Sequence, residues 1–438
     1  MIQYLLTAVI KQPNIKYVFY IHIKLYKIFG RTIMQLTTRQ IELVQSTIPI
    51  LKEHGVELTR YFYNRMLTNN PDLKEIFNLG NQRNDAQPHA LASAVLAYAQ
   101  NITKLQNLGD AVSQIAHRHV SLDIQPDQYP IVGTNLLHSI SEVLNVPMES
   151  ELIEAWTAAY QQLADILITT EANLYNKQDK TEGGWNGWKK FKIVDKQIES
   201  SEITSFYLQP ADNSPLPEYK PGQYISVRVM VPQLGIRQPR QYSLSDSNHP
   251  NYFRISVKKE IGDKQHAEGY VSTTLHEHYQ IGDELEVTNP TGTFILHHPH
   301  KNTVLISAGV GITPMIAILN TLAAEKNPHQ QISFIHACRN SNVLAMHQHI
   351  TELQQSMPNL HSYLACENPG KELAADKIGR LNLSELDSSL LPADADYYIC
   401  GPIEFMHTQY QALRDLQIPQ NQIFMELFGT GGFSQLAA

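Results

Sequence analysis

The hydrophobic periodicity of this 438-residue chain changes twice, and these changes limit the folds it can adopt. Between about residues 36 and 175, apolar residues recur at the 3.6-residue period of α-helices. Between 189 and 299 the period falls to two, in short runs interrupted by Pro and Gly, which indicates antiparallel strands. From 300 onwards, near-continuous apolar runs alternate with helical segments, which is typical of a parallel sheet covered by helices.

The predicted fold class is therefore multidomain: an all-α domain, an antiparallel β-barrel and an α/β domain with a parallel sheet. We expect these domains at 34–175, 189–299 and 300–438, with a polar, glycine-containing linker at 176–188. Residues 1–33 contain five Lys or Arg and no Asp or Glu. We expect this extension to lie outside the fold, with translation starting at Met34. A basic helix on a membrane surface is the alternative.

The composition excludes several functional classes. The net charge is −8 and no basic tract is interleaved with aromatic residues, which argues against a nucleic-acid partner. Cys338, Cys366 and Cys400 lack CxxC spacing, so neither a disulfide framework nor a cysteine-ligated zinc site is expected. They favour a reducing, cytoplasmic setting. No apolar run approaches the roughly 20 residues that span a bilayer, so membrane contact is not expected apart from an effect of the extension.

One short segment of the predicted barrel carries groups suited to a flavin. Arg240 can neutralise a phosphate, Tyr242 can lie against the isoalloxazine ring, and Ser243 can hydrogen-bond to ring or phosphate oxygens, with Gln241 between them. Tyr224, in an upstream Pro-Gly-Gln-Tyr sequence, strengthens this reading. An ordinary barrel strand remains the alternative for so short a sequence.

A second segment of the barrel suits a pyrophosphate. Gly269, Val271 and Ser272 precede a helix that we expect to begin at Thr273. The backbone N–H groups at the start of such a helix favour a phosphate.

A glycine-rich turn follows the first apolar run of the α/β region. It reads Gly309-Val310-Gly311-Ile312-Thr313-Pro314, and it suits the pyrophosphate of a nicotinamide dinucleotide. We expect Thr313 to be the N-cap of the following helix and Pro314 its first residue. The turn lacks the third glycine of the usual fingerprint, and glycine in a tight strand-to-helix turn can also be purely steric.

Another predicted strand ends in Cys400-Gly401-Pro402, at the sheet edge where ligands bind in such folds. A small buried hydrophobic residue is the alternative role for Cys400.

These signatures, in this order, resemble the ferredoxin–NADP reductase superfamily over about residues 190–430. The resemblance implies FAD in the barrel and a nicotinamide dinucleotide in the α/β domain. It also implies that Glu426 and Phe428 lie beside the flavin, although Leu427 and Thr430 differ from the residues that often surround this aromatic. Arg339, after another predicted strand, could reach a 2′-phosphate, so NADH and NADPH both remain open.

Three polar residues of the helical region fall on apolar faces. His119 shares a face with Val112, Ile115 and Ala116; Tyr63 and Gln87 lie on comparable faces of two other predicted helices. A lone histidine on such a face is more often a satisfied core residue than a metal ligand. Three inward polar groups are nevertheless costly unless something polar lies among them, and a haem with a diatomic ligand would satisfy all three.

From about Met34 to Gly429 the chain resembles the flavohaemoglobin family, a globin–reductase fusion that acts as a nitric oxide dioxygenase. The resemblance implies that His119 is the proximal iron ligand of a haem (heme b) and that Arg118 replaces the usual lysine beside it. It implies a distal site made by Tyr63, Gln87 and Leu91, with Phe77 packing on the haem. It also implies that Tyr129 and Glu171 form the pair that hydrogen-bonds to the proximal histidine.

The family resemblance also implies an activity. Electrons from NADH or NADPH pass through FAD to the haem, whose bound O2 oxidises nitric oxide (NO) to nitrate, without an obligatory protein partner. A haem-based O2 or NO sensor or carrier, and a reductase acting on another acceptor, are the alternatives. Pro88 is expected to bias Gln87 away from helical geometry and to displace the distal amide.

Overall fold

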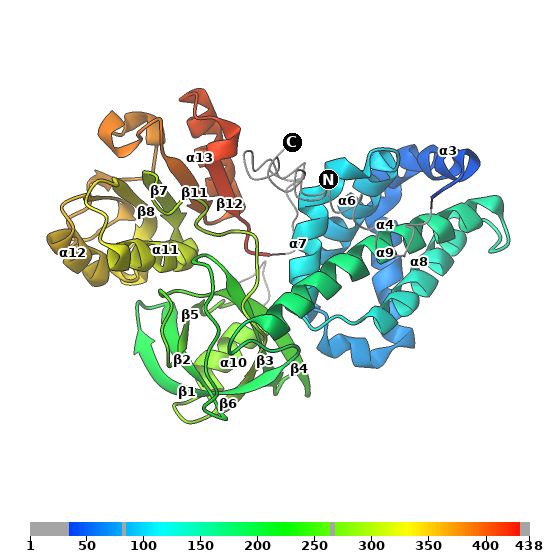
Figure 1. The fold of residues 1–438 in the computed structure, drawn as a ribbon, viewed down its shortest axis with the longest axis horizontal. Helices are drawn as coiled ribbons and strands as arrows, with labels where there is room; N and C mark the ends of the chain where they lie inside the picture. Colours follow the sequence, from blue (N-terminus) through cyan, green and yellow to red (C-terminus); the bar gives the residue numbers. More distant parts are fainter. Residues whose placement is uncertain (1–34, 81–84, 263–267, 430–438) are drawn as a thin grey trace, which may run out of the picture. The chain divides into compact units, whose positions relative to one another are not determined.

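The structure is a computed structural model that describes residues 35–80, 85–262 and 268–429 (Figure 1). The expected N-terminal extension and Thr430 lie outside these residues. The chain divides into two compact units. The first unit comprises the chain up to Pro71, Asp85–His119 and Ile124–Leu174, and the second comprises Asp72–Asn84, Val120–Asp123 and the chain from Tyr175 onwards. No helix of the described residues is long and apolar enough to cross a membrane.

The first unit is helical, as predicted. Its α-helices are α3 (Thr38–Ser46), α4 (Ile48–Asn69), α6 (Ala86–Asn101), α7 (Gly109–Val120), α8 (Tyr129–Leu144) and α9 (Glu151–Lys180), accompanied by the 3-10 turns η2 (Leu105–Leu108) and η3 (Pro126–Gln128). The 3-10 turn η1 (Pro71–Glu75) begins at the last residue before the segment that groups with the second unit. A capping box between Thr37 and Gln40 starts α3. Helix α9 runs to Lys180 and so includes residues 176–180 of the expected linker.

The apolar stripes read from the sequence form the core of this unit. Leu58, Phe62 and Met66 of α4 are buried. Helix α6 packs on α4 beside Gly55, where a Cβ would make an ordinary van der Waals contact of 3.5 Å with Cβ of Ala92.

The second unit begins with an antiparallel sheet and one helix. These elements are β1 (Lys189–Ile198), β2 (Ile203–Pro210), β3 (Tyr224–Val231), β4 (Ile236–Ser243), β5 (Phe253–Lys258), β6 (Glu284–Val287) and α10 (Tyr270–His278). The strand order is β4-β3-β6-β1-β2-β5.

The predicted closure of this sheet into a barrel is wrong for the described residues. The two edge strands are joined by a single bridge between Leu244 and Ile255 and not by a ladder. Pro239 lies in β4 and has no backbone N–H, which suits an edge strand.

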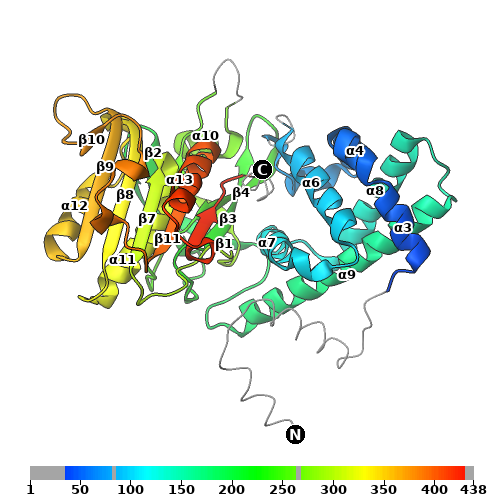
Figure 2. The ribbon, with the colours of Figure 1, turned by 90° about the horizontal axis from the view of Figure 1, so that it is seen from above.

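The rest of the second unit is a parallel sheet with the order β10-β9-β8-β7-β11-β12. Its strands are β7 (Thr303–Ala308), β8 (Ile332–Asn340), β9 (Leu360–Asn368), β10 (Lys377–Ile378), β11 (Asp396–Cys400) and β12 (Ile423–Glu426), and its helices and 3-10 turns are η4 (Gly309–Gly311), α11 (Ile312–Glu325), η5 (Ser341–Val343), α12 (His347–Ser356), η6 (Leu383–Glu385), η7 (Ser388–Leu390), α13 (Ile403–Asp415) and η8 (Gln420–Gln422). Helices α11 and α12 pack with Leu305 on one face, whereas α13 packs with Ile306 on the other (Figure 2).

The topology of this sheet predicts where a ligand binds. Strand β7 is followed in the chain by its neighbour β8, whereas its other neighbour, β11, comes from later in the sequence. Such a change of direction opens a crevice at the carboxyl ends of the two central strands. The turn at Gly309 and the Cys400-Gly401 pair both lie at this edge.

Candidate functional site

His119 lies in a hydrogen-bonded group with Tyr129 and Glu171, contributed by α7, α8 and α9. His119 Nδ1 lies 2.7 Å from Glu171 Oε1 and 3.1 Å from the Tyr129 hydroxyl. The Tyr129 hydroxyl donates to the same Glu171 oxygen at 2.6 Å. Glu171 is only 2% exposed, so its charge acts on these two groups with little screening by water.

This group determines which nitrogen of His119 can bind a metal. A carboxylate accepts hydrogen bonds, so His119 donates from Nδ1, and the lone pair of Nε2 is available. A histidine whose second nitrogen donates to a carboxylate is the usual arrangement for a metal ligand. The residues therefore fit an axial ligand of haem iron.

Helices α8 and α9 hold Tyr129 through a close contact. The Tyr160 hydroxyl donates to the Tyr129 carbonyl at 2.7 Å. Gly133 makes room for the Tyr160 ring, since a Cβ at this position would lie 2.4 Å from Cε1 of that ring.

Tyr63 lies on the buried face of α4 and is 7% exposed. Burial raises the pKa of its hydroxyl well above the ordinary value, so the group stays protonated and can donate a hydrogen bond. A protonated donor inside a helical core suits an electronegative ligand.

The expected displacement of Gln87 from the helix by Pro88 is wrong. Helix α6 begins at Ala86, so both residues lie in its first turn, where proline is tolerated because its missing N–H would have no helical partner. The Thr59 hydroxyl, one turn before Tyr63, donates to the Pro88 carbonyl at 2.8 Å. This bond holds the first turn of α6, with half-buried Gln87, against α4.

Three other residues of the predicted haem site stay predictions. Leu91 is half-buried on α6, one turn after Gln87. Arg118 is half-buried in the last turn of α7 beside His119. Phe77 belongs to the segment 72–84 that groups with the second unit.

Strand β4 brings the predicted flavin residues together. Ser243 pairs with Tyr224 across the ladder between β3 and β4. The Tyr224 ring lies against Gly292, where a Cβ would approach its Cε1 to 2.9 Å. The Gln241 amide donates to the Ser121 hydroxyl at 2.9 Å.

Arg240 supplies the electrostatic test of an anion site. Its guanidinium donates to the Pro239 carbonyl at 2.7 Å, and within the described residues it pairs with no carboxylate. Burial lowers the pKa of Arg240 to about 10. A desolvated cation without a counter-charge is costly, and a flavin phosphate would supply that charge. Tyr242 is half-buried next to it, and the residues fit FAD.

The helix of the second flavin segment starts three residues earlier than expected. Helix α10 begins at Tyr270 with Gly269 as N-cap, and not at Thr273. The earlier start places Ser272 inside the first turn, and a Cβ at Gly269 would lie only 2.6 Å from its hydroxyl oxygen. The Ser272 hydroxyl donates to the Gly269 carbonyl at 3.1 Å, and Val271 lies in the core of the sheet.

The two nucleotide motifs meet at the carboxyl edge of the parallel sheet. A Cβ at Gly311 would lie 2.3 Å from the Cys400 carbonyl oxygen and 2.7 Å from the Gly401 nitrogen. Gly309 has a φ of +53°, and a Cβ there would meet nothing within 4 Å. The glycine-rich turn thus packs tightly on one side and is open on the other, which fits a dinucleotide pyrophosphate.

The expected capping of α11 is wrong. The helix begins at Ile312 with Gly311 as N-cap, so Thr313 and Pro314 occupy its first turn. The Thr313 hydroxyl instead donates to the Val310 carbonyl at 3.0 Å, because the 3-10 turn η4 starts the helical geometry earlier.

Cys400 and Glu426 are register partners of neighbouring strands β11 and β12. The Cys400 side chain is fully buried, and burial raises the pKa of its thiol well above the ordinary value. Its thiol therefore has the character of a small buried hydrophobic residue. Pro402 is the N-cap of α13, and Phe428 is 41% exposed. The flavin contacts expected of Glu426 and Phe428 stay predictions.

Sequence reasoning missed a polar bridge between the two halves of the reductase. Asn320 of α11 donates to Asp246 at 2.7 Å and accepts from His349 of α12 at 2.7 Å. It also missed the buried Ser307–His336 pair (2.8 Å) on β7 and β8. A polar residue inside an apolar run was a signal for His336, whereas the bridge depends on tertiary structure alone.

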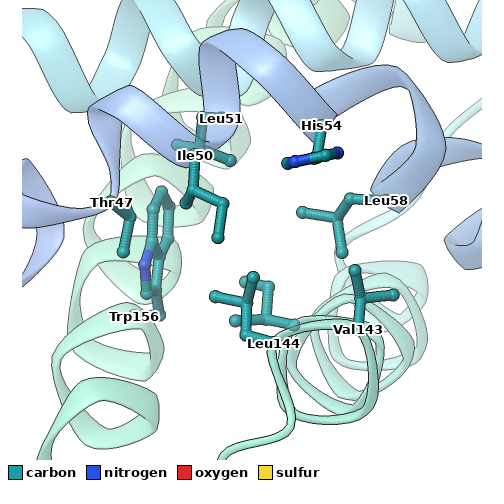
Figure 3. A pocket seen from close by; sticks show the side chains of 9 residues that line it. Thr47, Ile50, Leu51, His54, Leu58, Val143, Leu144 and Trp156 are labelled. Carbon is teal, nitrogen blue, oxygen red and sulfur yellow. The ribbon is translucent and has the colours of Figure 1, made fainter.

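An apolar groove in the first unit is separate from these residues. It is open to solvent, and Figure 3 shows its lining side chains around a common space. They come from α4, α8, α9 and the residue before α4 (Thr47, Ile50, Leu51, His54, Leu58, Ile140, Val143, Leu144 and Trp156). None of the predicted haem residues lines it.

Three family models match successive parts of the chain. The globin model matches residues 60–167, the oxidoreductase FAD-binding domain 190–295, and the oxidoreductase NAD-binding domain 305–411. These matches agree with the helical unit, the antiparallel sheet and the parallel sheet. The three matches show that the chain is an oxidoreductase that uses haem, FAD and NAD(P)H.

Similarity to known proteins extends over almost the whole chain. The flavohemoprotein of Bordetella pertussis is 48% identical over 396 residues, which cover 89% of this chain and 98% of that protein. The flavohemoprotein of Bacillus subtilis is 42% identical, with 90% and 98% covered. The crystal structure of the flavohemoglobin from Malassezia yamatoensis, with bound FAD and heme, superposes with a TM-score of 0.78 at 30% identity, covering 90% of this chain and all of that one. The chain therefore belongs to the flavohemoprotein family.

Proposed function

We propose that this flavohemoprotein is a nitric oxide dioxygenase that uses electrons from NADH or NADPH to convert NO and O2 to nitrate. The observation that carries the proposal is the His119–Tyr129–Glu171 group. When bound, haem supplies ligand binding and one-electron chemistry, and FAD converts a two-electron hydride donor into a one-electron source. The residues supply position, charge and exclusion of water.

Glu171 has the central role on the proximal side. Its carboxylate accepts a hydrogen bond from Nδ1–H of His119 and makes Nε2 a stronger electron donor. An electron-rich axial ligand favours the ferric state and the activation of bound O2, which an oxygen carrier does not need. We therefore infer an enzyme in preference to a carrier or sensor.

Tyr63 has the corresponding role on the distal side. Its buried, protonated hydroxyl would donate to an oxygen ligand, and Gln87 in the first turn of α6 would be the second polar group beside that ligand. Leu91 and Phe77 are proposed to complete the apolar wall.

The reductase residues suit electron supply. Arg240 would hold the flavin phosphate, Tyr242 would lie against the ring and Ser243 would bond to it, whereas Gly309 and Gly311 would admit the dinucleotide. A relative supports this reading: the flavohem-like FAD/NAD binding domain of nitric oxide dioxygenase from Vibrio cholerae is 36% identical, with a TM-score of 0.50, and 98% of it is covered by 55% of this chain. The three free cysteines favour the cytoplasm as the setting.

The test is NO consumption by the purified protein loaded with haem and FAD. The assay compares NADH with NADPH in the presence of O2 and measures nitrate as the product. NO loss with matching nitrate is expected, and Tyr63→Phe should reduce it by about 10- to 100-fold, the range for losing one hydrogen bond to a charged group. Flavin reduction should be unchanged in the variant. Flavin reduction without NO loss in the unmodified protein would contradict the proposal and favour another electron acceptor.

A further inference from the structure

An ion pair joins the antiparallel sheet region to the end of β8. Arg339 Nη2 lies 2.5 Å from Glu202 Oε1. Arg339 is the second-last residue of β8, and Glu202 directly precedes β2. Both residues belong to the second compact unit.

The place of this pair in the nucleotide domain gives it significance. β7 carries the glycine-rich turn, and β8 is its parallel neighbour. In dinucleotide-binding sheets of this kind, the adenosine ribose lies near the carboxyl end of the second strand, where an acidic residue meets a 2′-hydroxyl or an arginine meets a 2′-phosphate. Arg339 lies at that end, and the pair brings Glu202 to the same place.

Glu202 is the anchored partner. Its carbonyl accepts from the Lys259 N–H at 2.8 Å, and its own N–H bonds to the Ser200 hydroxyl at 3.3 Å. The N–H of Ser201 donates to the Asn342 carbonyl at 2.9 Å, in the turn that follows β8. The Glu202 side chain is 24% exposed and that of Arg339 is 64% exposed. The Glu202 backbone is therefore held in place and its side chain is largely covered, whereas most of the Arg339 side chain faces water.

Two cations close in the structure to the Glu202 segment already have carboxylate partners. Arg339 pairs with Glu202 itself, and Lys259, whose backbone N–H bonds to the Glu202 carbonyl, pairs through its ammonium with Glu277 at 2.8 Å. A 2′-phosphate carries nearly two negative charges and needs cations that are not already neutralised. A 2′-hydroxyl has no such need.

We propose that Glu202 makes this enzyme select NADH over NADPH, by holding Arg339 and by placing a carboxylate where the 2′-phosphate would lie. Glu202 is a specificity-determining residue that the sequence does not reveal, because it is 137 positions from Arg339. The proposal rests on NAD(P)H oxidation by the reductase half and not on the proposed reaction with NO.

The test replaces Glu202 by Gln in the full-length protein loaded with FAD and haem. We expect kcat/KM for NADPH in flavin reduction to rise about tenfold, which corresponds to about 1.4 kcal/mol, with little change for NADH. Glu277→Gln is the matched control, because it removes the same charge from the partner of Lys259. This control should leave the preference for NADH unchanged. Adding Arg339→Ala to Glu202→Gln should abolish the gain for NADPH.

A binding measurement keeps the test independent of turnover. Calorimetric titration should show that Glu202→Gln tightens the binding of adenosine 2′,5′-bisphosphate, but not of 5′-AMP, by a similar factor. An unmodified protein that prefers NADPH would overturn the proposal. So would a Glu202→Gln variant with unchanged affinity for the bisphosphate, or a double variant that keeps the gain. If the protein did not oxidise NO, these results could still be interpreted, because none of them measures NO.

Discussion

Replacing Glu171 by Gln tests the proximal group, because the change removes one charge and keeps the shape of the side chain. The carboxylate oxygen accepts two hydrogen bonds, from His119 at 2.7 Å and from Tyr129 at 2.6 Å, and is shielded from water. Hydrogen bonds to charged groups contribute about 1.5–3 kcal/mol, and neutral ones about 0.5–1.5 kcal/mol. The variant should therefore weaken the bond to His119 by about 1–1.5 kcal/mol.

This loss predicts a shift of the haem reduction potential. The Glu171 charge stabilises the more electron-rich imidazole, which favours the oxidised metal, so its removal should raise the potential. For a one-electron couple, about 1.4 kcal/mol corresponds to about 60 mV. Spectroelectrochemical titration of the haem-loaded protein measures this shift directly, and the rate of NO consumption should fall in parallel.

Tyr129→Phe is the matched control, and it should act in the opposite direction. It removes a donor to Glu171, so the carboxylate becomes a stronger acceptor for His119 and the potential should fall. A potential unchanged in Glu171→Gln, or the same direction of shift in both variants, would refute the proposed role of this group.

Two further predictions concern the reductase half. Arg240→Gln should weaken FAD binding by about 10- to 100-fold, the range for losing a charged hydrogen bond, with haem content unchanged; flavin fluorescence after ultrafiltration measures it, and full retention of FAD would contradict the phosphate site. Burial lowers the pKa of His336 to about 4, whereas an unfolded histidine titrates near 6.5, so the unfolded state gains its proton first as the pH falls. The free energy of unfolding should then drop by up to about 3 kcal/mol between pH 6.5 and 4, and denaturant titrations should show a flatter dependence in His336→Asn.

The sequence predicted the layers of the fold because burial imposes a period on each element. The stripe of Leu58, Phe62 and Met66 is the buried face of α4, and the apolar run at 303–306 is the centre of β7. Whether the antiparallel sheet closes into a barrel was not predictable, because closure depends on the geometry of six strands together. Only the assembled sheet shows Pro239 on an edge.

The starts of two helices were misplaced for a shared reason. Thr313 has a hydroxyl that can accept a capping hydrogen bond and glycine has none, yet Gly311 is the N-cap of α11. In the same way, α10 begins after Gly269 and not at Thr273. Both N-caps are glycines in crowded positions, since a Cβ at Gly269 would meet the Ser272 hydroxyl and one at Gly311 would meet the Cys400 carbonyl. The pairs Glu202–Arg339 and Asp246–Asn320 were invisible because their partners are distant in sequence.

The close packing of the glycine-rich turn can be tested with Gly311→Ala. The new Cβ would lie 2.3 Å from the Cys400 carbonyl oxygen, and this backbone belongs to a buried strand that cannot yield. The turn must move instead, so flavin reduction by NADH should be lost while FAD and haem contents and reduction by dithionite persist. Gly309→Ala separates packing from ligand binding, because its Cβ enters open space and costs only the strain of a φ of +53°, about 1 kcal/mol. This control should keep a folded nucleotide domain and raise the KM for NADH. An ordinary KM in Gly311→Ala would mean that the dinucleotide binds elsewhere.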